Sequence, residues 1–203
     1  ASPFVRLVRE LTSKNRLDAP PSLKDRHQVV DPPLCSPAEA DAILADFSAR
    51  LEAIVAYCHR IGARPILIAP PAAEAGVEPS RSTVGPDVDA AERRRLTTEF
   101  LDAKGREASE PDAAVAAYRS ILDAHPGFAE AHYRIGERMR AQGRTEEARR
   151  AFLDALDLDG LPIHCLKPFR DAYLRFAEGR GCLVVDGRLA LMAASPSGLL
   201  DEQ

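Results

Sequence analysis

The chain has 203 residues, of which 45% are hydrophobic and 29% are charged, and its formal net charge at pH 7 is -4. This composition excludes a chain that is disordered throughout, because the apolar content is ordinary and the net charge is small. With 27 basic residues against 31 acidic ones, the chain has no overall positive charge to attract nucleic acid. The longest apolar runs, 66–69 and 189–194, are far shorter than the roughly 20 residues that a membrane helix requires. One or two globular domains are expected.

The start of the chain lacks an initiator methionine and the charged and apolar regions of a signal peptide, so we expect a processed chain or a fragment. The sequence does not indicate in which cellular compartment the protein acts. Four cysteines, at positions 35, 58, 165 and 182, contain no CxxC pair. We expect buried free thiols rather than a disulfide framework, because four cysteines are few for this length.

The first twelve residues predict a short helix. Ser2 is placed to cap it, and the apolar residues that share one face are Phe4, Leu7, Val8 and Leu11. From Thr12 to Ser36 the periodicity is lost and prolines accumulate, which indicates a loop.

A long helix is predicted next, followed directly by a strand. Ser36, Pro37 and Glu39 form the pattern of a capping box with proline in the first turn. Gly62 is suited to end the helix in the left-handed conformation. The apolar run at 65–69 then predicts a buried parallel strand that is covered by helices.

A second unit of the same kind lies near the end of the chain. A helix is predicted over 168–178 and a strand over 182–186. Asp186 then lies at the carboxyl end of that strand, which is the edge where open α/β sheets place their sites.

About 95 residues between the two strands are mainly helical in pattern, and 129–160 fit the 34-residue tetratricopeptide template. The matching positions are Ile135, Gly136, Met139, Gly143, Ala148, Phe152 and Ala155. Half of a preceding repeat matches through Ala114, Tyr118, Ile121 and Pro126. Because a free-standing solenoid needs about three repeats, we expect these helices to pack on the α/β part.

These features together resemble bacterial SGNH (GDSL-type) hydrolase-like proteins that carry tetratricopeptide repeats. The resemblance implies a three-layer α/β/α body with parallel strands and an all-α helical insert. Its expected boundaries are 1–84 for the first part of the body, 85–162 for the insert and 163–203 for the last part. The chemistry that it implies is hydrolysis of a small ester by serine, histidine and aspartate, with no cofactor.

The catalytic blocks of that family are missing from this sequence. No serine follows a Gly-Asp pair, Asn15 is the only asparagine, and no histidine follows Asp201. We therefore expect an internal, catalytically incomplete piece of such a hydrolase, with the nucleophile and base encoded outside the chain.

Three residues are candidates for a substrate pocket. Asp186 could contact substrate, or its carboxylate could cap the turn after the strand. Arg81 and Ser82 lie in the loop that leaves the same sheet edge and could line the pocket. A solvated turn is the favoured interpretation of these two residues, since no base stands nearby in the sequence.

Tyr133, Glu137 and Arg140 are candidates for partner binding, because they fall on positions that line the concave groove of tetratricopeptide proteins. The alternative is that they pack on the α/β part or face solvent. The Cys58-His59 and His164-Cys165 pairs lack the spacing of zinc ligands, so no metal is expected. The arginine runs 93–95 and 149–150 are interpreted as solvated helix faces.

Two classes of function remain. The first is a piece of an SGNH-like ester or acetyl hydrolase. The second is a non-catalytic module that binds a protein or peptide through its tetratricopeptide helices, with the α/β part as scaffold.

Overall fold

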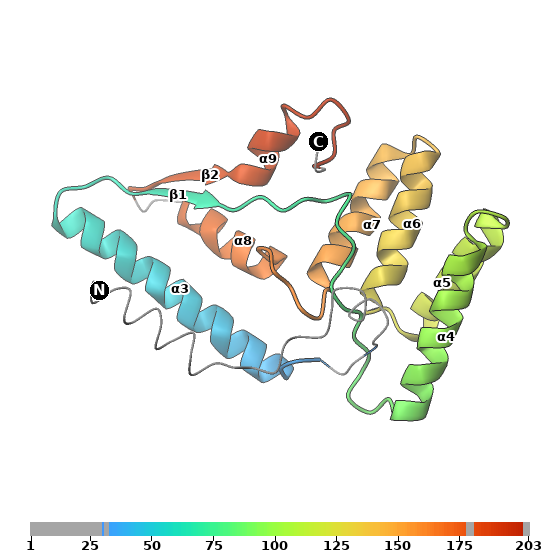
Figure 1. Ribbon diagram of the computed structural model, residues 1–203. Helices are drawn as coiled ribbons and strands as arrows, with labels where there is room; N and C mark the ends of the chain where they lie inside the picture. Colours follow the sequence, from blue (N-terminus) through green and yellow to red (C-terminus); the bar gives the residue numbers. More distant parts are fainter. Residues whose placement is uncertain (1–29, 31–32, 178–180, 201–203) are drawn as a thin grey trace, which may run out of the picture.

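The computed structural model describes residues 30, 33–177 and 181–200. The helix expected over residues 1–12 and most of the loop after it lie outside these described residues. The described chain forms a helical bundle beside a small sheet with its own helices (Figure 1).

Helix α3 (Pro37–Arg60) begins as the sequence predicts. The Ser36 hydroxyl accepts a hydrogen bond from the Glu39 amide at 3.3 Å, and the Glu39 carboxylate accepts one from the Ser36 amide at 2.8 Å. These two bonds satisfy amides that the first turn leaves without helical partners. The helix is followed by Gly62, whose φ of 73° favours glycine.

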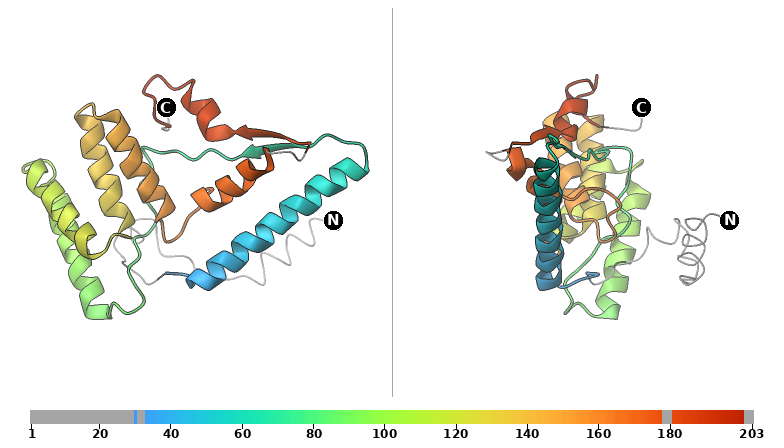
Figure 2. Two further views of the ribbon diagram at one scale, coloured as in Figure 1. Left: turned by 180° about the vertical axis from the view of Figure 1, so that it is seen from behind. Right: turned by 90° about the vertical axis from the view of Figure 1, so that its left-hand side faces the viewer.

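Strands β1 (Ile66–Ala69) and β2 (Leu183–Asp186) pair in parallel, with Ile66 opposite Leu183 and Ile68 opposite Val185. The inner sheet face packs on α3, helix α8 (Lys167–Leu174) and the 3-10 turn η1 (Arg175–Ala177). Leu67, from the inner face, packs there with Leu51, Val55 and Phe176. Helices α3 and α8 lie on the same side of the two strands in both figures (Figures 1 and 2).

The expected three-layer α/β/α body is wrong. Of the described residues, 59% are helical and 5% lie in strands, and the only described sheet has two strands. Strand β1 is not covered on both faces either, because Ile66 is 61% exposed and Ile68 57% exposed, while Leu67 and Ala69 are buried. The two apolar runs are strands, as predicted, but no described segment supplies a layer over their outer face.

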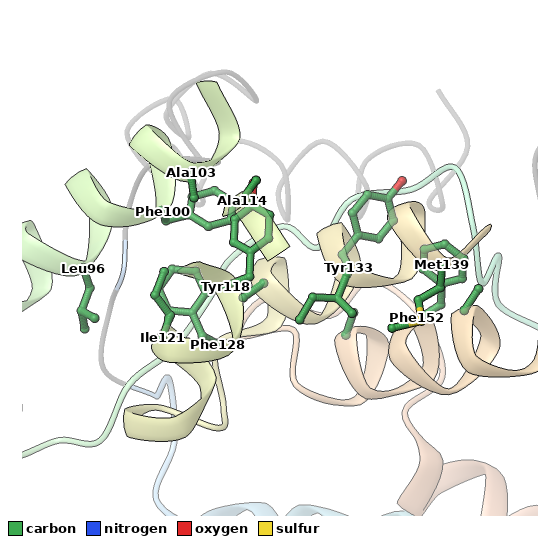
Figure 3. Packing of buried hydrophobic residues seen from close by; sticks show 14 of the residues in the cluster. Leu96, Phe100, Ala103, Ala114, Tyr118, Ile121, Phe128, Tyr133, Met139 and Phe152 are labelled. Atoms are coloured by element: carbon green, nitrogen blue, oxygen red, sulfur yellow. The ribbon is translucent and has the colours of Figure 1, made fainter. Parts of the chain in front are cut away.

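Four helices form the second part of the molecule, and their side chains build the larger core (Figure 3). They are α4 (Ala90–Arg106), α5 (Pro111–Ala124), α6 (Ala129–Ala141) and α7 (Thr145–Asp157). Phe100 contacts both Tyr118 and Phe128, with ring centroids 5.6 and 5.3 Å apart. This cluster also takes in Val30 and Leu199 from distant parts of the chain.

Helices α6 and α7 approach closely because small residues lie between them. A Cβ atom added to Gly136 would stand 2.7 Å from the ring of Phe152, and both Phe152 and Ala148 are fully buried. This close contact is the one that the repeat pattern predicts at these positions. Membership of the tetratricopeptide family stays a prediction.

A short helix, α9 (Gly187–Met192), directly follows β2. The segment after α9 is bonded to the loop after β1, since the amides of Glu74 and Ala75 donate to the carbonyl of Leu200 at 2.6 and 2.9 Å. No described helix is both long enough and apolar enough to cross a membrane.

Replacing Ala148 with leucine tests the contact within the bundle. Because Ala148 is completely buried, the added side chain has no space, and we expect a loss of roughly 1 to 3 kcal/mol in the free energy of unfolding. Chemical denaturation measures it. Ala141→Leu, at an exposed position on α6, is the control and should change stability little. Equal stability of the two variants would contradict the packing described here.

Candidate functional site

A pocket of about 360 Å³ lies at the carboxyl end of the sheet. Pro70 and Ala72 enter it from the loop after β1, and Arg188 enters from the first turn after β2. The other wall comes from α7, α8 and the loop between them. Its remaining lining residues are Arg150, Leu153, Asp154, Leu156, Asp157, Cys165, Lys167 and Arg170. Four segments that are distant in the sequence therefore converge at the sheet edge where α/β proteins place ligands.

Asp186 lies beside this pocket, and its carboxylate is fully engaged by protein groups. Its Oδ1 accepts from the amides of Arg188 and Leu189 at 3.1 and 3.3 Å, which caps α9. The guanidinium of Arg170 donates to both oxygens. Burial acts to raise the pKa of Asp186, but the bonds from Arg170 and the α9 amides outweigh it and hold the pKa below its usual value. The structure thus gives Asp186 a capping and orienting position.

Arg81 and Ser82 do not line the pocket. The Ser82 hydroxyl is buried, donates to Oε2 of Glu130 at 2.9 Å and accepts from the Glu130 amide at 3.0 Å. The backbone of Arg81 is held by Asp159 and by the amide of Gly160. These bonds fasten the 80–82 segment to the first turn of α6 and the end of α7, so the expectation of a solvated turn is also not met.

Tyr133, Glu137 and Arg140 all lie on α6, and the described contacts of the three side chains differ. Tyr133 is buried, with its ring centroid 5.4 Å from that of Phe152 (Figure 3). Glu137 accepts from Arg140 at 2.8 Å within one turn of the helix. Glu137 lines only a hollow of about 110 Å³ between α5 and α6.

The sequence analysis did not find the basic residues of the pocket or the buried charge contacts beside it. It placed both residues of the 149–150 run on a solvated helix face. Arg150 is exposed, but the side chain of Arg149 is only 14% exposed and lies 3.7 Å from the buried carboxylate of Glu74. Arg188 reaches the same carboxylate at 3.3 Å. No local pattern could have found these contacts, because they join residues 75 or more positions apart.

The outer sheet face, formed by Ile66, Ile68, Leu183 and Val185, is the second notable surface. The parallel register places these four side chains on the same side of the sheet. Leu183 is 48% exposed, like the two isoleucines. Leu189 and Leu191 of α9 are also about half exposed. Apolar exposure on one sheet face is unusual, because parallel sheets are normally covered on both faces.

The described residues show no arrangement for nucleophilic or metal chemistry. No serine hydroxyl in this part of the chain is hydrogen-bonded to a histidine, and Ser82 is held by Glu130 instead. Across the ranges that the structure describes, no group of three or more potential ligands could hold a metal ion. The four cysteines are free thiols, none of them fully buried.

Comparisons with models of protein families, with curated proteins and with solved structures found no match.

The buried Glu130 should make stability depend on pH. Burial raises its pKa to about 8, with the Ser82 hydrogen bond opposing the shift. A carboxyl group whose pKa is higher in the folded state stabilises the fold fully below its unfolded pKa, and the stabilisation is lost as pH rises to about 8. Glu130→Gln removes this titration, so its stability relative to the parent should increase by roughly 2 to 4 kcal/mol between pH 5 and 8.

Urea denaturation of both proteins across this pH range measures the difference. Glu99→Gln, on the exposed side of α4, is the matched control and should track the parent chain. A pH-independent difference between Glu130→Gln and the parent would show that Glu130 does not titrate as described.

Proposed function

We propose that this chain is a non-catalytic assembly module that pairs with a second copy of itself through the outer sheet face. The observation that carries the proposal is the exposure of Ile66 and Ile68, which are 61% and 57% accessible on a face made only of Ile, Leu and Val side chains. An interaction role was one of the two functions expected from the sequence. The surface that supports it lies on the sheet rather than on α6.

The chemistry of the outer sheet face supports self-pairing. Ile66, Ile68, Leu183 and Val185 carry no charge or hydrogen-bonding group, so a two-fold axis can bring the face against itself without burying an unpaired polar side chain. Two twisted sheets pack face to face by interdigitating such side chains. Side chains on the inner face are already committed to α3 and η1, which leaves the outer face for an intermolecular contact.

The available area suits a modest affinity. Exposed apolar patches of this kind cover on the order of 500 Å². Two copies would then bury about 1,000 Å², which is near the lower limit of a specific interface. We expect a dimer with a dissociation constant in the tens of micromolar rather than an obligate dimer.

The hydrolase hypothesis rests on the sequence resemblance alone. The described residues do not form the three-layer body that it implies, and the Ser82 hydroxyl is fully buried and bonded to Glu130 rather than to a histidine. We therefore propose no hydrolytic step for this chain, and any ester hydrolysis belongs to a longer protein that would supply both nucleophile and base.

Substitution in the centre of the outer sheet face tests the proposed function. We expect the full chain to show a concentration-dependent monomer–dimer equilibrium in sedimentation velocity, and Ile68→Asp to be monomeric across the same concentrations. A carboxylate at this position would be buried without a partner in the dimer. In the monomer, position 68 is exposed, so the variant should fold.

Ile163→Asp is the control, since Ile163 is 81% exposed in the loop before α8 and lies outside the sheet. It should dimerise like the parent. A parent chain that stays monomeric into the hundreds of micromolar, or an Ile68→Asp variant that dimerises normally, contradicts the proposal.

A second measurement separates this function from hydrolysis. The purified chain should not turn over p-nitrophenyl acetate above the background rate, because the Ser82 hydroxyl is fully buried and donates to Glu130 rather than to a histidine. Saturable release of p-nitrophenolate that an active-site serine reagent abolishes would overturn this expectation. Ser82→Ala would then show whether Ser82 is the nucleophile.

A further inference from the structure

The geometry points to a binding site for a small organic anion, with a carboxylate or phosphate head and a short apolar tail, in the pocket at the carboxyl end of the sheet. This site is separate from the outer sheet face, since none of the four residues of that face lines the pocket. The inference therefore stands independently of dimerisation.

Basic side chains are the most numerous charged groups in the lining of the pocket. Arg150, Lys167, Arg170 and Arg188 line it, against two carboxylates, Asp154 and Asp157. Asp154 is 62% exposed to solvent, and burial raises the pKa of Asp157 above its usual value. Asp157 also accepts a hydrogen bond from the backbone amide of Lys167 at 2.8 Å. Lys167 is in addition paired with Asp171 of α8 at 2.5 Å, so Arg150 is the lining cation without a hydrogen-bonded partner among the described residues.

Two of the arginines are held in place before any ligand arrives. The Arg170 guanidinium is oriented by both oxygens of Asp186, and that of Arg188 by the buried Glu74. Because a guanidinium has five N–H donors, each retains donors after these bonds are made. Fixed arginines lower the cost of ordering the site when a planar or tetrahedral anion binds.

Arg150 differs from these two and is the residue expected to close on the ligand. Its side chain is exposed, and no hydrogen bond or ion pair joins it to another described residue. It projects from α7 at the pocket, one position after Arg149 and three before Leu153. Its charged neighbour on the helix is Glu147, which is itself bonded to Arg144, so Arg150 can pair with the head group without breaking a hydrogen bond.

Four apolar residues of the lining account for the tail. Pro70, Ala72, Leu153 and Leu156 line the same pocket, which at about 360 Å³ is of the size that holds small ligands. A neutral amphiphile would contact these apolar residues but would leave the remaining N–H donors of the arginines without an anion. The arrangement therefore favours an anion with a tail of a few carbons over either part alone.

Titration with three six-carbon probes, followed by ¹⁵N-resolved NMR of the full chain, tests the site. Sodium hexanoate and hexyl phosphate share the tail and differ in the head group, while hexanol has the tail alone. We expect at least one anion to bind, with shifts concentrated on the amides of the second half of α7 and of α8. Hexanol should bind at least about tenfold more weakly.

Arg150→Gln should weaken binding of the anion about fivefold or more and leave folding unchanged, because Arg150 is exposed and unpaired. Arg94→Gln, at an exposed arginine on α4 that does not line the pocket, is the matched control. The inference is overturned if hexanol binds as tightly as both anions, if the shifts fall outside the pocket, if neither anion binds, or if Arg150→Gln binds like Arg94→Gln.

Discussion

The buried carboxylate of Glu74 is the point at which the two parts of the molecule are held together. Its side chain has no solvent exposure and lies within 3.3 Å of Arg188, from the first turn after β2, and 3.7 Å of Arg149, from α7. Burial raises its pKa, and the two arginines oppose that rise. Removal of the carboxylate would take one charged partner from each of two partly buried guanidinium groups, and breaking a buried ion pair typically costs about 3 to 5 kcal/mol. The sheet and the bundle therefore share one electrostatic constraint.

That constraint also determines the pocket. Arg188 is both a partner of Glu74 and a lining residue, so the position of the pocket wall depends on a charge that no ligand can reach. The Arg149 guanidinium also donates to the carbonyl of Gly198. The backbone amides of residues 74 and 75 donate to the carbonyl of Leu200. The segment after α9 is thereby fixed against α7. Binding at the carboxyl end of the sheet would act on groups that also connect the two cores.

A second buried acid, Glu130, binds the 80–82 segment, which lies between β1 and α4, to the bundle. Ser82 caps the first turn of α6 through the Glu130 amide, and Asp159 accepts from the amides of Ser80 and Arg81 at 2.9 and 3.1 Å. The 80–82 segment is thus ordered by side chains that belong to helices far away in the sequence. Its serine is well placed for capping and poorly placed for nucleophilic attack.

Local features of the fold could be predicted from sequence because their physical causes are local. The capping box of Ser36 and Glu39 joins residues three positions apart, and the two apolar runs that follow helices are strands, as expected. Whether a third layer covers the outer face of the sheet could not be predicted from sequence. Residues of β1 alternate between exposed and buried, but all four are apolar, so the sequence pattern does not distinguish the two faces. Contacts such as Arg188 with Glu74, 114 positions apart, have no sequence pattern.

The placement of the two proposed surfaces explains how one small sheet could serve both. Successive side chains of a strand alternate between faces, so Ile66 and Ile68 point outward while Leu67 packs on α3 and η1. The pocket uses neither face, because it is built on the loops that leave the carboxyl ends of the strands. An apolar contact between copies through the outer sheet face therefore need not cover Arg150 or Arg170. Since the inner face is occupied by the protein's own helices, association and ligand binding can occupy the outer face and the edge at the same time.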